Sequence, residues 1–347
     1  MILTGLLPAW RLDGPGLLLT IGVAVAAVLA EPLLKQATGG MVSLPAMVIA
    51  LLIGIALSNL AQREVFRPGL AYCVKKLLRY AIALLGLKIA LADITALGAS
   101  VIGIVIVAMA VTIAGSIFLS RRLGTGDGLG ALCGAASAVC GASATLATAT
   151  VVPAYPGKSA DVAFAVVAAN LLSTVVMLAY PPLAHWLGFS NQHTGILLGA
   201  TIHDMAQVVG SSYAISDAVG NTAVVVKLFR VFLLLPIVLL IGLWFTRTAG
   251  ASAEAKVPFP TFALVFIGLA GLNSIAPALP GFAGLFAAMK PLLIQASSYG
   301  LLISIAALGL GTSVTSLRSI GWRHALIFGS ATVLIFGIVC GGLLILE

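Results

Sequence analysis

Long apolar stretches separated by short polar segments run through almost the whole chain. A helix needs about 20 mostly apolar residues to cross a bilayer. By this measure the pattern predicts eleven transmembrane helices, at residues 15–31, 44–60, 70–92, 97–119, 128–152, 160–184, 195–216, 219–246, 260–276, 281–313 and 322–346. The ninth stretch is short, and the tenth is long enough to be tilted or broken. The pattern is that of an all-α polytopic membrane protein.

Composition supports this prediction. Hydrophobic residues make up 61% of the 347 residues and charged residues only 8%, against about 25% charged residues in an average soluble protein. So few charges could not cover a soluble surface, which excludes a soluble enzyme, a nucleic-acid-binding protein and a disordered chain. The four cysteines form no CxxC pair, and we expect them to pack as small buried residues.

The net charge of +8 belongs to the loops and indicates orientation. Cytoplasmic loops of membrane proteins collect Lys and Arg. With eleven crossings, twelve of the 18 basic residues fall on one side, four fall within spans, and only Lys35 and Lys158 fall on the other side. This bias predicts a cytoplasmic N-terminus and an external C-terminus.

Two of the predicted spans are unusual. Residues 128–150 carry almost no large side chains, and residues 199–213 place polar and ionisable side chains at membrane depth. Each segment could cross the membrane as a broken helix or enter it as a re-entrant hairpin. Charge counting does not decide between these arrangements, because only Lys158 would change sides if both were re-entrant.

An internal repeat is also suggested. Residues 82–98 align with residues 305–321 without a gap, and six of the 17 positions match. In the predicted order the two copies have opposite orientations. Inverted repeats with interrupted helices near the bilayer midplane are typical of secondary transporters. The alternative is a chance alignment of Leu-, Ala- and Gly-rich helices.

The small-residue segment has two interpretations. Small side chains allow close helix packing. Alternatively, glycines open the helix, and the freed N–H groups at the start of the second half bind an anion. The expected break and its hydroxyl donors give the candidate residues Cys140, Gly141, Ala142, Ser143 and Thr145.

His203 and Asp204 are adjacent ionisable residues inside a predicted span. Such residues are costly in a membrane and often functional. We expect a proton or Na⁺ site, with Asp204 as acceptor and His203 titrating near neutral pH. Thr201 shares a helical face with Asp204, and Gln207 lies between the faces of Asp204 and His203. We expect Thr201 and Gln207 to contribute to substrate binding. The alternative is a structural ion pair between Asp204 and a nearby cation.

Lys227 and Arg230 lie on one helical face near the bilayer centre. With one acid, Asp204, they leave an excess of positive charge that a small anion would neutralise. The alternative is that they pair with Asp204 and with the main-chain carbonyls of a broken helix.

Three motifs carry a family resemblance: Cys140–Ala144, Gly199–Gly210 and Lys227–Val231. In these the chain resembles the YeiH-type membrane proteins of bacteria, a family labelled as sulfate exporters and similar to the bile acid:sodium symporter superfamily. The resemblance implies a bacterial inner-membrane protein with inverted five-helix repeats, a panel domain and a core domain with crossing broken helices. We therefore expect one integral membrane domain over residues 1–347, with residues 128–246 in its core bundle.

Together these features predict a secondary transporter for a small anion, such as sulfate or a related oxyanion or organosulfonate, coupled to H⁺ or Na⁺. A cation/proton antiporter with Asp204 as the ion site is the alternative. The sequence has no paired catalytic carboxylates, HExxH, G-x-S-x-G or ATP-binding P-loop, so we expect neither an enzyme nor a cofactor. The expected partners are the anion and the lipid bilayer, with a homodimer left open.

Overall fold

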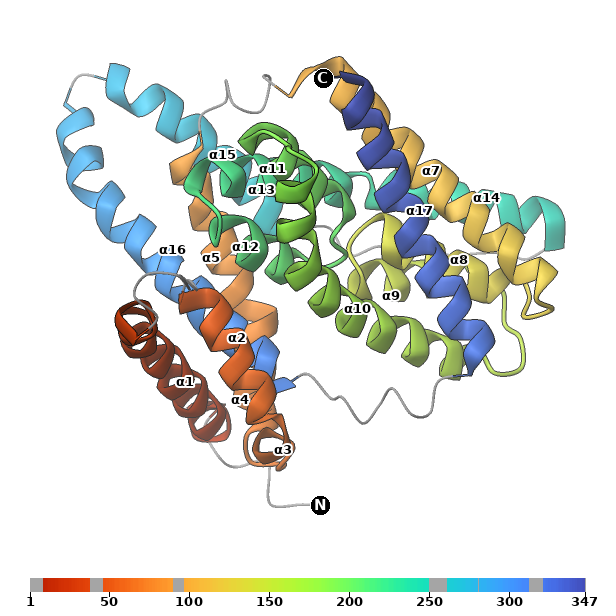
Figure 1. The fold of residues 1–347 in the computed structure, drawn as a ribbon, viewed down its shortest axis with the longest axis horizontal. Coiled ribbons are helices and arrows are strands. Elements are labelled where there is room, and N and C mark those ends of the chain that lie inside the picture. Colours follow the sequence, from red (N-terminus) through yellow and green to blue (C-terminus); the bar gives the residue numbers. More distant parts are fainter. Residues whose placement is uncertain are drawn as a thin grey trace. The chain divides into compact units, whose positions relative to one another are not determined.

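The computed structural model describes residues 9–37, 46–89, 97–249, 261–279, 281–311 and 321–346, and every regular element in these ranges is a helix (Figure 1). The chain divides into two compact units. Unit 1 comprises residues 1–91 and 261–313, and unit 2 comprises residues 92–260 and 314–347. The predicted core bundle, residues 128–246, lies entirely in unit 2.

Unit 1 contains short helices and three long ones. Glycines allow two close approaches here: a Cβ added to Gly54 would lie 2.9 Å from Gly309 Cα, and one added to Gly69 would lie 2.7 Å from Gly16 Cα. The elements are α1 (Ala9–Ala37), α2 (Ala46–Ala56), α3 (Ser58–Ala61), α4 (Arg67–Tyr72), a π-helical turn (Cys73–Leu77), α5 (Leu78–Leu85), a 3₁₀ turn (Gly86–Lys88), α15 (Thr261–Ile275), a 3₁₀ turn (Ala276–Ala278) and α16 (Ala283–Gly311).

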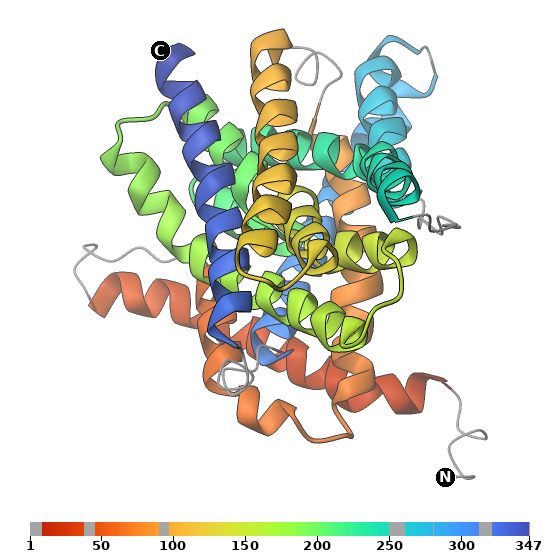
Figure 2. The ribbon, with the colours of Figure 1, turned by 90° about the vertical axis from the view of Figure 1, so that its right-hand side faces the viewer.

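Unit 2 has three long helices, α7, α10 and α17, and pairs of shorter ones. Helices α7 and α17 pack side by side (Figures 1 and 2). The elements are α7 (Gly98–Arg122), α8 (Asp127–Ala138), α9 (Ala142–Val151), α10 (Lys158–Trp186), α11 (Asn191–Thr201), α12 (Met205–Tyr213), α13 (Asp217–Phe232), α14 (Leu234–Ala249) and α17 (Trp322–Leu346).

Seven helical segments of the described chain are long and apolar enough to cross a membrane. They correspond to seven of the eleven predicted spans. The other four predictions, at 44–60, 70–92, 128–152 and 195–216, fall on segments that are divided into shorter helices. Eleven uninterrupted spans are thus not observed, whereas the interruptions of 128–152 and 195–216 are.

The first interrupted segment, α8–α9, is a hairpin that begins and ends at one end of unit 2. Asp127, which begins α8, is ion-paired with Arg121 at the end of α7. The ring of Tyr155, in the loop after α9, lies against Gly128 near the start of α8. Tyr155 Oη also donates to Asp161 at the start of α10, which contacts His324 at the start of α17. Both ends of the hairpin therefore lie beside the starts of α10 and α17.

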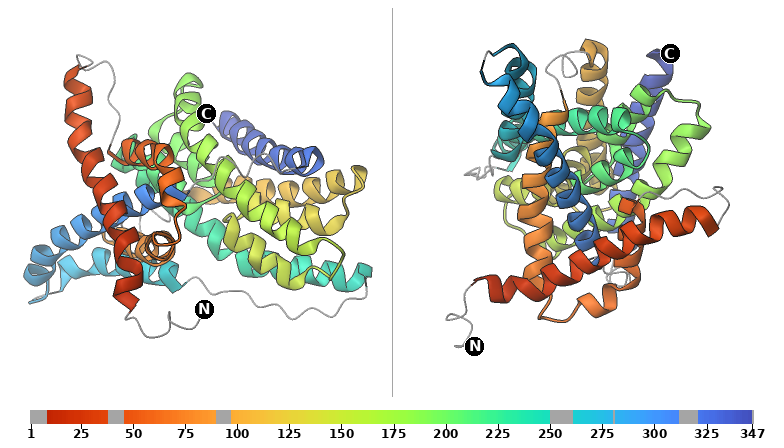
Figure 3. Two further views of the ribbon diagram at one scale, coloured as in Figure 1. Left: turned by 90° about the horizontal axis from the view of Figure 1, so that it is seen from below. Right: turned by 90° about the vertical axis from the view of Figure 1, so that its left-hand side faces the viewer.

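The second interrupted segment, α11–α12, is a hairpin at the opposite end of unit 2. Gly195 of α11 packs on Thr222 of α13, and Tyr213 at the end of α12 donates to Asn221 of α13 at 2.7 Å. Both limbs therefore return to the start of α13. The single 29-residue helix α10 connects the two ends, because it starts beside the first hairpin and finishes before the second (Figures 1 and 3).

This topology corrects one assignment in the charge analysis. Lys158 begins α10 at the same end of unit 2 as Arg121 and Arg323. Lys158 therefore lies on the same side as most of the other Lys and Arg residues, as expected if segments 128–150 and 199–213 are re-entrant hairpins. The predicted repeat is not tested, because residues 90–96 and 312–320 of the alignment lie outside the described residues.

Candidate functional site

The tips of the two hairpins meet inside unit 2. Gly141 interrupts the first hairpin with a φ of +61°, a conformation that glycine adopts without steric cost. The second is interrupted at 202–204, between α11 and α12. A Cβ added to Gly141 would lie 3.7 Å from the carbonyl oxygen of His203 and 3.9 Å from Asp204 Oδ2. The two breaks are therefore in contact and form one site.

Lys227 of α13 binds main-chain carbonyls at the C-terminal ends of α8 and α11, the first helix of each hairpin. Its Nζ donates to Val139 O at 2.7 Å, Ile202 O at 2.9 Å and His203 O at 2.6 Å. The last carbonyls of a helix have no partner within the helix and carry the negative end of its dipole. A buried ammonium group is therefore stabilised where two such ends converge.

Arg230, one turn further along α13, completes the same arrangement. Its guanidinium donates to Ser137 O at 2.7 Å, Ala138 O at 2.9 Å, Gly199 O at 2.9 Å and Ile202 O at 3.1 Å. Both cations have an exposed fraction of 0%. All the hydrogen bonds described for these two side chains go to main-chain carbonyls, as in the alternative that they pair with carbonyls of a broken helix.

The N-terminal ends of α9 and α12, the second helix of each hairpin, differ in their capping. Asp204 caps α12, because its Oδ1 accepts from Ala206 N at 2.9 Å, while its own N–H donates to Ser173 Oγ at 3.1 Å. The cap of α9 is Gly141, which has no side chain to offer. Cys140, Ala142 and Ser143 around this helix start are partly exposed, as is Asp204. The start of α9 thus lacks a side-chain cap and lies among partly exposed residues.

The local charge is positive. Two cations and one carboxylate meet at the tips, and the four helix ends contribute partial charges of about +0.5 and −0.5 that cancel in pairs. With Lys227 and Arg230 protonated, Asp204 ionised and His203 neutral, the net charge at the crossing is about +1. An anion beside the start of α9 would neutralise it.

His203 and Gln207 are fully buried, with an exposed fraction of 0%, and contact α17 and α10 respectively. His203 Nε2 is 2.9 Å from Thr332 Oγ1, and its ring meets Phe328 edge-on. Gln207 Nε2 donates to Asn170 Oδ1 at 3.3 Å, whereas Gln207 Oε1 is buried without a hydrogen-bond partner. Gln207 therefore keeps an unused acceptor next to the crossing.

Sequence reasoning missed several supporting residues on α10 and α17. Ser173 and Thr174 contact Asp204 and Gln207, and Thr332 contacts His203. The signal was present on α10, because Asn170, Ser173 and Thr174 have the i, i+3, i+4 spacing of one helical face. Thr332 is isolated in an apolar helix, and no local pattern distinguishes it.

The predicted site residues all lie on the hairpins or on α13. Thr145 and Thr201 are buried and donate to carbonyls of their own chain segment, Gly141 O at 3.1 Å and Leu197 O at 2.6 Å, so their hydroxyl protons are engaged locally. In the described chain no group of three or more His, Cys, Asp or Glu side chains could hold a metal ion. The structure brings the breaks at Gly141 and at 202–204 into contact with each other and with Lys227 and Arg230. The other predicted residues, Cys140, Ala142, Ser143, Thr145, Thr201 and Gln207, lie on the helices that adjoin these breaks.

Comparisons with known proteins agree with the architecture of a membrane protein. The family described as Conserved hypothetical protein 698 matches residues 15–328. The chain is 39% identical over 306 residues to the UPF0324 membrane protein TauZ of Paracoccus pantotrophus, covering 86% of this chain and 88% of the relative. It is 36% identical over 330 residues to a UPF0324 membrane protein of Chlorobaculum tepidum, covering 94% and 88%. No solved structure matches. The chain therefore belongs to the UPF0324 family of membrane proteins, which is the YeiH-type family.

Proposed function

We propose that the protein is a secondary transporter of a small anion in the cytoplasmic membrane of a bacterium. The observation that carries this proposal is the meeting of two oppositely directed hairpins, whose carbonyl ends are neutralised by Lys227 and Arg230. Interrupted helices that meet near the membrane midplane form the substrate sites of many secondary transporters.

The anion site in this proposal is the first turn of α9. Its N–H groups and the hydroxyl of Ser143 are donors suited to an oxyanion, and Ser143 is partly exposed. Lys227 and Arg230 supply a positive potential from behind the tips without touching the anion. Sulfate and organosulfonates are the proposed substrate class, and the name TauZ of two Paracoccus relatives adds taurine to the compounds worth testing.

Asp204 is the proposed coupling residue. It is partly exposed and lies next to Gly141, so its ionisation would change the potential felt by an anion at the start of α9. A proton or Na⁺ bound at Asp204 would favour anion binding, because it removes the nearest negative charge. His203 contacts Thr332 rather than Asp204 and orients the second tip in this scheme.

The experiment is anion flux in proteoliposomes. Purified protein is reconstituted, and uptake of labelled sulfate and taurine is followed with imposed pH and Na⁺ gradients. Ser143→Ala removes one candidate donor and should weaken anion binding about three- to tenfold, the value of one hydrogen bond. Thr150→Ala is the matched control, because Thr150 is an exposed hydroxyl on the same helix.

The outcomes separate the candidate functions. Uptake above empty vesicles, weakened by Ser143→Ala and unchanged by Thr150→Ala, supports the anion site. Gradient-driven Na⁺/H⁺ exchange in the absence of any transported anion, abolished by Asp204→Asn, would replace the proposal with the antiporter alternative. No flux of any ion tested, from protein that binds none of them, would refute a transport role at this site.

A further inference from the structure

A separate apolar groove lies between α7 and α14 of unit 2. Its volume is about 560 Å³. Side chains of both helices line it, among them Ile106, Ala110 and Ala114 of α7 and Pro236, Leu240 and Trp244 of α14. None of the predicted site residues lines the groove, although Leu233 follows Arg230 by three residues.

The groove has the length of one lipid leaflet. From Ile106 to Arg121, α7 rises about 22 Å at 1.5 Å per residue, and one leaflet of a bilayer with its headgroups is about 20–22 Å thick. The groove runs along two helices that are long or apolar enough to lie within the membrane. An acyl chain laid along it would therefore remain at the depth of its own leaflet.

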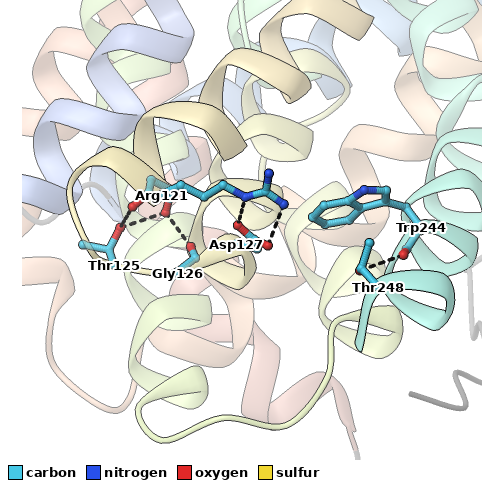
Figure 4. A network of polar contacts seen from close by, with 7 residues as sticks. Arg121, Thr125, Gly126, Asp127, Trp244 and Thr248 are labelled. Carbon is cyan, nitrogen blue, oxygen red and sulfur yellow. Dashed lines mark hydrogen bonds and ion pairs between the residues drawn. The ribbon is translucent and has the colours of Figure 1, made fainter. Parts of the chain in front are cut away.

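One end of the groove is cationic. Arg121 lines this end, where Asp127 holds its guanidinium through two hydrogen bonds and the Trp244 ring lies 5.3 Å away (Figure 4). The exposed Arg122 and Arg247 lie at the ends of the same two helices. The three arginines and Asp127 together carry about two positive charges.

The turn that carries Asp127 is firmly built. Ser120 Oγ and Thr125 Oγ1 lie 2.7 Å apart, and Thr125 also donates to Ser120 O at 3.1 Å (Figure 4). These bonds fix the chain reversal between α7 and α8, so Asp127 can orient Arg121 toward Trp244. Tryptophan is typical of the membrane interface, which places the cationic end at headgroup level.

We propose that this groove binds an anionic phospholipid, with one acyl chain along α7 and α14 and the phosphate at Arg121, Arg122 and Arg247. Basic clusters at the ends of transmembrane helices recognise anionic headgroups, whereas zwitterionic lipids offer no net charge to them. The three arginines fall on the side that the charge pattern assigns to the cytoplasm, where a headgroup of the inner leaflet would lie. The site shares no residue with the proposed transport site.

The test is native mass spectrometry of the whole purified chain, delipidated in detergent and titrated with phosphatidylglycerol or phosphatidylcholine of the same acyl length. We expect one tightly bound phosphatidylglycerol and a weaker response to phosphatidylcholine. Arg122→Gln and Arg247→Gln should each lower the preference about fivefold at low salt. Arg323→Gln is the charge-matched control, because Arg323 is exposed on α17, a helix that contributes no residue to the groove.

A second pair of variants tests whether the acyl chain occupies the groove. Ala114→Phe places a ring in the groove and should reduce binding of phosphatidylglycerol. Val111→Phe is its control, because Val111 is 41% exposed on the same helix but does not line the groove. Both positions are open, so both variants should fold.

Three results would overturn the proposal. Equal affinity for the two lipids, or equal effects of Ala114→Phe and Val111→Phe, would exclude a specific lipid site. A dimer that Ala114→Phe dissociates, with no lipid preference in the wild type, would show that a second copy of the chain covers the groove instead.

Discussion

Removing the guanidinium of Arg230 should destabilise the fold, because both hairpin tips lose hydrogen bonds to it. In Arg230→Met, the carbonyls of Ser137, Ala138 and Gly199 lose their bond to a charged group, whereas Ile202 O keeps its bond to Lys227. In Lys227→Met only Val139 O and His203 O lose theirs, because Ile202 O keeps Arg230. Arg230→Met should therefore be the more destabilising of the two.

The magnitude follows from the number of bonds. A hydrogen bond to a charged group contributes about 1.5–3 kcal/mol, so three lost bonds correspond to about 5–9 kcal/mol. The removal of a buried charge offsets several kcal/mol of this, since the cation no longer has to be desolvated. We expect a net destabilisation of about 3–5 kcal/mol for Arg230→Met and a smaller loss for Lys227→Met. Arg230→Lys keeps the charge but not the planar fork, and should fall between the wild type and Arg230→Met.

The assay is the fraction of protein that remains monodisperse after heating in mild detergent, measured by size-exclusion chromatography, because membrane proteins often unfold irreversibly. Arg79→Met is the control, since Arg79 is an exposed cation outside the site. If Arg230→Met has the same midpoint as Arg79→Met, the guanidinium does not hold the tips. If Lys227→Met is more destabilising than Arg230→Met, the bond count is the wrong basis for the prediction.

Other features of unit 2 can be tested in the same way. Gly199→Ala should destabilise the fold much more than Gly103→Ala in the heating assay, because a Cβ at Gly199 meets the main chain of Ala223 whereas Gly103 has open space around it. Arg122→Cys and Ser159→Cys should react with an impermeant maleimide from one side of the membrane and Gln192→Cys from the other; labelling of 122 and 159 from opposite sides would show that 128–151 crosses. Burial, and secondarily Asp161, raises the pKa of Tyr155 above its usual value of about 10. The folded chain thus holds this proton more tightly than the unfolded chain, and the resulting stability is present at neutral pH and lost as the pH rises above that value. The midpoint of the wild type should therefore fall more steeply above pH 10 than that of Tyr155→Phe, and parallel curves would contradict this.

Local features of the sequence were sufficient for the long helices and for the positions of the breaks. The apolar runs predicted α7, α10 and α17 within a few residues, and the glycines near Cys140 predicted the first break. The re-entrant topology depends on contacts such as Gly128 with Tyr155, and no local pattern encodes them. Charge counting could not supply it either, because Lys158 is the one basic residue whose side depends on the topology.

The partners of the buried cations were also beyond local reasoning. The carbonyls that bind Arg230 come from segments up to 93 residues away in the chain. The sequence showed two cations and one acid at similar depth, which is compatible both with an ion pair and with an anion site. Only the folded arrangement shows that main-chain carbonyls, and not Asp204, are the hydrogen-bond partners that the described structure gives to Lys227 and Arg230.

The sign of the proposed ligand follows from how each kind of helix end is satisfied. A hairpin tip inside a membrane exposes carbonyls at the end of one limb and N–H groups at the start of the next, and both are costly when unpaired. Lys227 and Arg230 donate hydrogen bonds to the carbonyls of both tips, and Asp204 accepts a hydrogen bond from an N–H group at the start of α12. The N–H groups at the start of α9 have no side-chain cap from Gly141 and lie beside partly exposed residues. The proposed ligand at this helix start is therefore one that accepts hydrogen bonds and carries negative charge, whereas the proposed coupling cation binds at the neighbouring Asp204 carboxylate.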